Sequence, residues 1–253
     1  MIIDLPSLSQ TSELRALWCE AFGDSEEFFD LFLNTAYSSK RCRVLMLDGS
    51  VVAALYWFDC EYEGERIAYL YAIATKKAYR GRGICQALMN DTHAHLTALG
   101  YAAAILVPSE PSLFGFYERI GYTPCSSIQE FSCSASGENI TLTQIDKLEY
   151  ASLRRKYLPA KSVIQEKENL DFLTAQAKLY KGDGVLLAAH VQGDKLIGLE
   201  LLGDTSLSPR LVKAFGCSSG EFRSVGDSRR FAMYLPLDDK KLSPPAYLGF
   251  AFD

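Results

Sequence analysis

The sequence lacks the patterns that would place it in several large protein classes. It has no run of about eighteen apolar residues, so we expect no membrane span. Its N-terminus has neither a basic start nor a long apolar stretch, which argues against a secretion signal. Seven cysteines occur without a C-x-x-C pair, so we expect reduced thiols in the cytoplasm and neither a disulfide framework nor a zinc site.

Basic residues are also in short supply. The net charge is −5, and residues 1–135 carry 10 Lys and Arg against 16 Asp and Glu. An acidic first half argues against general nucleic-acid binding and is compatible with a cationic substrate. The 253 residues, 48% of them hydrophobic, suit a globular chain with two domains of modest size. A homo-oligomer is compatible with the sequence, which does not determine the oligomeric state.

Histidine is rare, with three in the chain. His93 and His95 are two positions apart on a predicted helix and therefore point in different directions. They cannot chelate one metal ion there, so we interpret them as surface residues and predict no metal.

One stretch organises the rest of the chain: a basic, glycine-rich turn at 78–83. It follows a strand-like apolar run at 67–74 and precedes a helical pattern at 84–99. Gly81 and Gly83 permit positive φ and leave room for a phosphate beside the backbone. The amides of a helix N-terminus, its dipole and two arginines together favour an anion, so we predict a pyrophosphate site. Neither the Walker pattern nor the dinucleotide pattern G-x-G-x-x-G is present.

Two motifs resemble those of a known superfamily. Arg80, Gly83 and Cys85 match Arg-x-x-Gly-x-Gly/Ala except that Cys85 replaces the usual small residue. This resembles the acetyl-CoA-binding motif of the GCN5-related N-acetyltransferase (GNAT) superfamily. The segment 116–122, FYERIGY, resembles the second GNAT motif, in which a short helix carries a tyrosine before a Gly-aromatic turn. The resemblance covers roughly residues 40–133.

The resemblance and the periodicity together predict an α/β (α+β) fold with a mixed central sheet and helices on both faces. We expect helices at 11–22, 25–37, 84–99 and 113–120, strands at 43–47, 51–62, 67–74 and 101–107, and a last strand pair ending near 133. The small polar run 134–138 marks a boundary, so we predict a GNAT domain at 1–135 and a second domain at 136–253. The second domain echoes the first without its own cofactor turn. We interpret it as a degenerate GNAT-like half, with an unrelated α+β cap as the alternative.

The resemblance implies an acetyl-CoA-dependent N-acetyltransferase that acts by direct attack of a primary amine, with no covalent intermediate. Tyr117 would be the general acid that protonates the leaving thiolate. Backbone amides at the strand end would bind the pantetheine and the acetyl oxygen, and those of the turn would bind the pyrophosphate. The implied cofactor-binding residues are Ile73, Ala74, Thr75, Arg80, Gly81, Arg82, Gly83, Ile84, Cys85 and Gln86.

The general base stays open at this point. Glu110 follows the predicted parallel strand, and Asp59 with Glu61 share one strand face. The sequence also resembles the enhanced-intracellular-survival acetyltransferases, whose terminal carboxylate is the base, which makes Asp253 a third candidate. The acceptor, a small amine or a peptide, is not identified.

Two other functions fit the same motifs. One is a non-enzymatic acyl-CoA sensor. The other is a tandem aminoacyl transferase resembling the Fem family, although the acidic first half and the acetyl-CoA-type turn argue against charged tRNA as a substrate.

Overall fold

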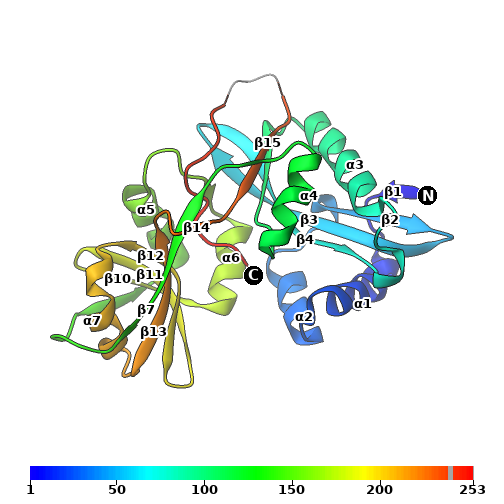
Figure 1. Ribbon diagram of the computed structural model, residues 1–253. Helices are drawn as coiled ribbons and strands as arrows, with labels where there is room; N and C mark the ends of the chain where they lie inside the picture. Colours follow the sequence, from blue (N-terminus) through cyan, green and yellow to red (C-terminus); the bar gives the residue numbers. More distant parts are fainter. Residues whose placement is uncertain (239–241, 253) are drawn as a thin grey trace. The chain divides into compact units, whose positions relative to one another are not determined.

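The computed structural model describes residues 1–238 and 242–252, and the chain divides into two compact units (Figure 1). The first unit comprises Met1–Thr123 and Met233–Ser243, and the second comprises Pro124–Ala232 and Pro244–Asp253. This division differs from the predicted boundary at 135/136, because each unit includes a segment from the far side of that boundary.

The first unit is an α/β structure built on a mixed sheet. Its elements are β1 Ile2–Asp4, α1 Thr11–Phe22, α2 Glu26–Thr35, β2 Cys42–Leu47, β3 Ser50–Tyr62, β4 Glu65–Thr75, α3 Ile84–Ala98, β5 Ala103–Leu106, α4 Phe114–Arg119, β6 Thr123–Pro124 (at the boundary) and β15 Met233–Pro236. The strand order is β1-β2-β3-β4-β5-β15-β6. Within the described residues, β4 and β5 are parallel, and the other neighbours from β1 to β15 are antiparallel.

Local sequence explains where the helices of this unit begin and end. The Ser25 hydroxyl accepts a hydrogen bond from the Phe28 amide at the start of α2, where two acidic residues suit the helix dipole. Gly23 ends α1 in the left-handed conformation, at φ 76°. The predicted face of α3 is buried from Ile84 to Leu96, whereas Leu99 is 47% exposed because the helix ends before it.

Helices cover both faces of the sheet, as predicted. Neighbouring residues of β3 point to opposite faces. Tyr56 contacts Trp18 of α1, with ring centroids 5.6 Å apart. Trp57 belongs instead to the core cluster that contains Leu88 and Leu96 of α3. The fold class predicted from the sequence is therefore confirmed.

The second unit repeats the strand order of the first. Its elements are β7 Ser127–Ser134, β8 Leu142–Ile145, α5 Lys147–Tyr157, β9 Ile164–Gln165, α6 Glu168–Gln176, β10 Lys178–Gly182, β11 Val185–Gln192, β12 Lys195–Gly203, α7 Ser208–Ala214, β13 Ser219–Val225 and β14 Arg229–Arg230. The sheet order β8-β10-β11-β12-β13 corresponds to β1-β2-β3-β4-β5, with α7 joining the parallel strands β12 and β13 as α3 joins β4 and β5.

Two strands join a different sheet from the one that the sequence predicts. Strand β7, expected at the end of the first sheet, pairs with β13 and β14 in the second. In the first sheet, β15 occupies the position beside β5, with Met233 opposite Leu106. Periodicity predicts that a segment is a strand but does not specify its partner. The sheet positions predicted for β7 and β15 were wrong for this reason.

Candidate acetyl-transfer site

The end of β4 separates from its parallel neighbour. Strands β4 and β5 pair only from Ile67 with Ala103 to Leu70 with Leu106. Beyond Leu70, β4 continues to Thr75 with β3 on its other edge, and the register shifts between Tyr71 and Ala74. Ala72 lies in this bulge at φ 48°, a conformation that costs a non-glycine residue about 1–2 kcal/mol. Backbone from Tyr71 to Thr75 is thus outside the β5 ladder, on the strand that leads into the turn.

The turn after β4 is braced to the body of the first unit. The Lys76 amide donates to the carbonyl of Val52 (2.9 Å), and the Lys77 amide donates to the Glu20 carboxylate (2.6 Å). The Arg80 Nε donates to the carbonyl of Thr75 (3.0 Å), so its guanidinium stabilises the strand end. Arg82 is exposed, with its guanidinium 5.5 Å from the centroid of the Tyr79 ring.

Gly81 and Gly83 adopt the left-handed backbone conformation that the turn requires. Both have φ of 75°, and a Cβ built on either would contact nothing within 4 Å. The space beside the turn is therefore open, as a bound anion requires. Gly83 is the N-cap of α3 without a capping side chain, and Ala87 is the first residue whose amide bonds back to it (2.9 Å). The amides of Ile84, Cys85 and Gln86 precede that bond, so they are the donors that the helix leaves for a ligand.

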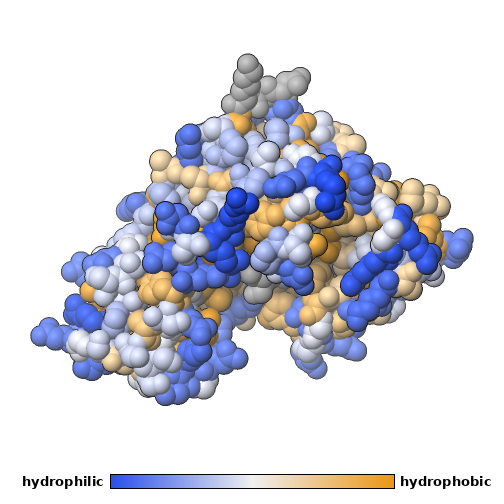
Figure 2. Space-filling view, in the orientation of Figure 1, coloured by the Kyte–Doolittle hydropathy of each residue, from blue (hydrophilic) through white to orange (hydrophobic). Residues whose placement is uncertain are grey.

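Tyr117 lies in the same core cluster as the start of α3. Its ring is 7% exposed and packs among Ile84, Leu88 and the partly buried Ile73 and Cys85. Burial raises the pKa of the Tyr117 phenol, with a smaller contribution from Cys85, so the phenol keeps its proton at neutral pH. The structure thus brings the predicted acid together with one end of the predicted cofactor-binding turn. In the space-filling view an apolar area lies over α4, the helix that carries Tyr117 (Figure 2).

Cys85 has the properties of a packing residue. It is half-buried, and burial raises the pKa of its thiol to about 11. Burial disfavours the charged thiolate, whereas an exposed thiol at a helix N-terminus would have a lowered pKa. A neutral thiol at physiological pH is a weak nucleophile.

The base candidates differ in their surroundings. Glu110 is exposed, and its carboxylate accepts a hydrogen bond from Ser112 (3.1 Å). Asp59 is engaged by Arg66 (3.0 Å) and by the Tyr101 hydroxyl, which indicates a structural role. Glu61 is exposed, and Asp253 lies outside the described residues.

Sequence reasoning missed one polar pair behind Tyr117. His93, predicted at the surface, is half-buried, and its Nε2 lies 2.8 Å from the Tyr122 hydroxyl. Burial lowers the pKa of His93 to about 4, so the imidazole is neutral at physiological pH. A signal was present, because His93 follows the buried Met89 by four residues and precedes the buried Leu96 by three.

Within its described residues, the second unit has no equivalent of the glycine-rich turn at 78–83. Where β12 leads toward α7, the chain reads Gly203-Asp204, and the Asp204 carboxylate accepts the Ser206 amide (2.9 Å). Hydrogen bonds from the Ser206 side chain and, to a smaller extent, from its amide lower the pKa of Asp204, so this segment carries a negative charge where the first unit has arginines. The acidic pair Asp183-Gly184 forms the hairpin turn between β10 and β11.

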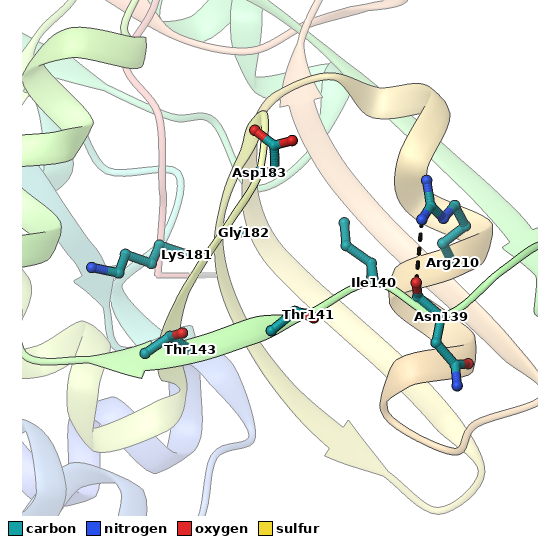
Figure 3. A pocket seen from close by; sticks show the side chains of 8 residues that line it. All are labelled: Asn139, Ile140, Thr141, Thr143, Lys181, Gly182, Asp183 and Arg210. Carbon is teal, nitrogen blue, oxygen red and sulfur yellow. Dashed lines mark hydrogen bonds between the residues drawn. The ribbon is translucent and has the colours of Figure 1, made fainter.

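A hollow of about 530 Å³ in the second unit offers no comparable donors (Figure 3). Arg210 on its wall donates to the carbonyls of Glu138 (3.0 Å) and Asn139 (3.2 Å). Lys181 pairs with Glu149 (2.5 Å). Both cationic side chains that line the hollow, Lys181 and Arg210, therefore already have partners within the protein.

The first unit therefore has the architecture of an acyl-transferring α/β domain. Residues 3–125 match the family model described as an acetyltransferase (GNAT) domain. No curated protein sequence matches the chain. We found no group of three or more His, Cys, Asp or Glu side chains placed to hold a metal within 1–238 and 242–252, and none of the helices described there is long and apolar enough to cross a membrane.

Solved structures share the fold over nearly the whole chain. A GCN5-related N-acetyltransferase from Anabaena variabilis has a TM-score of 0.71 at 14% identity and covers 94% of this chain and 73% of its own. Eis1 from Mycobacterium abscessus has a TM-score of 0.67 at 13% identity, covering 94% and 74%. A putative acetyltransferase from Pyrococcus horikoshii has a TM-score of 0.63 at 16% identity, covering 98% and 93%. At these identities the likeness establishes the fold, and both units are included in it.

Proposed function

We propose that the protein is an acetyl-CoA-dependent N-acetyltransferase that transfers an acetyl group directly to a primary amine. One observation carries the proposal: an uncapped helix N-terminus and two glycines at φ 75° face open space at the end of a strand that has separated from its neighbour. A side chain on either glycine would enter the space that a pyrophosphate needs.

Different backbone segments of the first unit bind different parts of acetyl-CoA. Amides from Gly81 to Gln86 hold the pyrophosphate, while Arg80 fixes the turn through Thr75. Amides in the bulge from Ile73 to Thr75 bind the pantetheine and the acetyl oxygen. The bound thioester supplies the acyl group.

Tyr117 supplies the proton that the reaction needs. As the amine nitrogen bonds to the carbonyl carbon and the carbon–sulfur bond breaks, the phenol donates its proton to the sulfur. The raised pKa of Tyr117 keeps that proton available throughout the neutral range. The proton lost by the amine goes to a base, for which the exposed Glu110 is our candidate within the described residues.

Acetyl-CoA calorimetry followed by a thiol-release assay tests the proposal. The amine panel contains a peptide N-terminus, lysine, a polyamine, an aminoglycoside and small metabolic amines. We expect binding and release of coenzyme A with at least one of them. Binding without turnover on any amine would favour an acyl-CoA sensor, and absence of binding would contradict the proposal and leave the aminoacyl transferase to be tested.

The turn itself can be tested with Gly83→Ala. An alanine at φ 75° costs about 1–2 kcal/mol, and its methyl group enters the space reserved for the phosphate. We expect acetyl-CoA affinity to fall about 10-fold, which corresponds to a similar energy. The matched control is Gly64→Ala, which imposes the same strain at φ 80° in the turn between β3 and β4. Equal losses of affinity in the two variants would show that the turn binds no phosphate.

A further inference from the structure

The element that carries Tyr117 cannot by itself fix the position of the phenol. Helix α4 has six residues, which is less than two turns. So short a helix is not stable in isolation and takes its geometry from its contacts. Whatever orients the Tyr117 ring must therefore lie in the packing around α4.

Tyr122 makes two such contacts with Tyr117. Its amide donates to the Tyr117 carbonyl (3.1 Å), which closes the turn after α4. Its ring meets the Tyr117 ring edge-on, with centroids 5.9 Å apart. Tyr122 is 1% exposed, so its hydroxyl needs a partner within the protein.

That partner comes from α3. His93 Nε2 lies 2.8 Å from the Tyr122 hydroxyl, and the two rings are tilted against each other with centroids 5.5 Å apart. His93 follows Ile84, the first residue of α3, by nine positions. At 1.5 Å per residue, the imidazole is anchored about 13 Å along the axis from the helix start. The helix that begins at the phosphate turn thus also anchors Tyr122.

We propose that His93 and Tyr122 are positioning residues for Tyr117, and that their hydrogen bond holds the phenol at a set distance from the N-terminus of α3. This inference rests on the proposed function. The pyrophosphate and the sulfur are joined by the pantetheine arm of one ligand, and a rigid α3 keeps the distance between the site for the pyrophosphate and the phenol constant. Loss of the hydrogen bond between His93 and Tyr122 leaves the phosphate site intact but allows the Tyr117 phenol to move.

Three variants test the roles of His93 and Tyr122 separately. Tyr122→Phe keeps the ring and removes the hydroxyl, His93→Leu removes the partner, and His93→Gln restores a neutral side chain that can hydrogen-bond. We expect kcat to fall about 10-fold in the first two, since small displacements of a catalytic group are costly. The acetyl-CoA Kd should change less than about two-fold in the same variants, because the turn is untouched, and His93→Gln should recover most of the activity.

His95→Gln is the matched control. His95 is on the same helix and half-buried, but its ring packs on Trp57, with centroids 6.0 Å apart. It should leave kcat and Kd unchanged. An equal loss in His95→Gln would point to a general effect on α3 and overturn the inference.

The double variant Tyr117→Phe with Tyr122→Phe shows whether Tyr122 acts through Tyr117. When two groups act as a unit, the effects of removing each of them on the activation free energy are not additive. If Tyr122 positions the phenol, removing its hydroxyl has no further effect once the Tyr117 hydroxyl is gone. If the two losses multiply, Tyr122 acts independently and the inference is wrong.

A readout that needs no turnover distinguishes this inference from the proposed function. With tyrosine labelled at ¹³Cζ, we expect the Tyr117 resonance of the free protein to shift or broaden in Tyr122→Phe and His93→Leu but not in His95→Gln. An unchanged resonance in the first two variants would overturn the positioning role, whether or not the protein is an enzyme. A shifted resonance in a protein that acetylates no amine would instead contradict the proposed function alone.

Discussion

Replacing Tyr117 by phenylalanine is expected to lower turnover by roughly 10²–10⁴-fold, the range typical of a lost general acid. The ring is buried among the residues at the start of α3, and phenylalanine preserves that packing. The loss should therefore appear in kcat, while the acetyl-CoA Kd stays nearly unchanged because the amides that we propose hold the pyrophosphate belong to another element.

The thiol-release assay and calorimetry measure the two quantities separately. Tyr180→Phe is the matched control, since it removes a phenol from the second unit, where Tyr180 packs edge-on against Phe215 with centroids 4.9 Å apart. Because burial raises the pKa of Tyr117, the wild-type rate should not decline through loss of its proton between pH 7 and 9. Full turnover in Tyr117→Phe would remove this residue from the mechanism.

Replacing Glu200 by alanine is expected to destabilise the second unit by about 3–5 kcal/mol, the cost of leaving a buried charge without its partner. The carboxylate of Glu200 is 0% exposed and pairs with Arg154, which is 2% exposed, at 2.8 Å. The Tyr150 hydroxyl also donates to it (2.9 Å), as does that of Tyr247 (3.3 Å). Alanine would leave a buried guanidinium and two buried hydroxyls without these bonds.

The same cluster secures the segment 244–252. The Arg154 guanidinium lies 4.6 Å from the centroid of the Phe250 ring and donates to Gln165 (3.2 Å). Gln165 in turn donates to the carbonyl of Phe250 (2.7 Å). A Cβ on Gly249 would lie 2.1 Å from Arg154 Nη2, so the backbone approaches the guanidinium closely. Glu200→Ala should therefore also expose this segment to limited proteolysis.

Two further variants make the stability test specific. Glu221→Ala removes the same charge from an exposed pair with Lys195 (2.6 Å), which should cost less than about 1 kcal/mol. Arg154→Met combined with Glu200→Leu removes both buried charges and should recover part of the loss. Thermal and urea unfolding give the values. Equal melting temperatures for Glu200→Ala and Glu221→Ala would contradict the prediction.

Several features could be predicted because their cause is local. The turns at Asp48-Gly49 and Glu63-Gly64 both have positive φ, as the residue types indicate. The helix start at Ile84 follows from a left-handed Gly83, and the parallel pairing of β4 with β5 follows from the length of the crossover. The position of the glycine-rich turn between β4 and α3 was predictable for the same reason.

The remaining features depend on contacts between distant parts of the chain. The pairing of β15 with β5 joins residues more than a hundred positions apart, and no periodicity encodes it. The bulge at Ala72 gave no signal, because alanine carries no preference for φ 48°. The hydrogen bond between His93 and Tyr122 also depends on the tertiary structure, because these residues lie 29 positions apart and become neighbours only when the segment after α4 packs against α3.

By itself the sequence determined the elements, their order and the glycine turn, since these depend on periodicity and on conformations that individual residues allow. Only the tertiary structure decided which sheet β7 and β15 join, how Tyr117 meets the start of α3, and which polar groups are buried together. The physical reason is that strand partnership and burial are set by the free energy of the whole packed core, to which residues far apart in the chain contribute jointly.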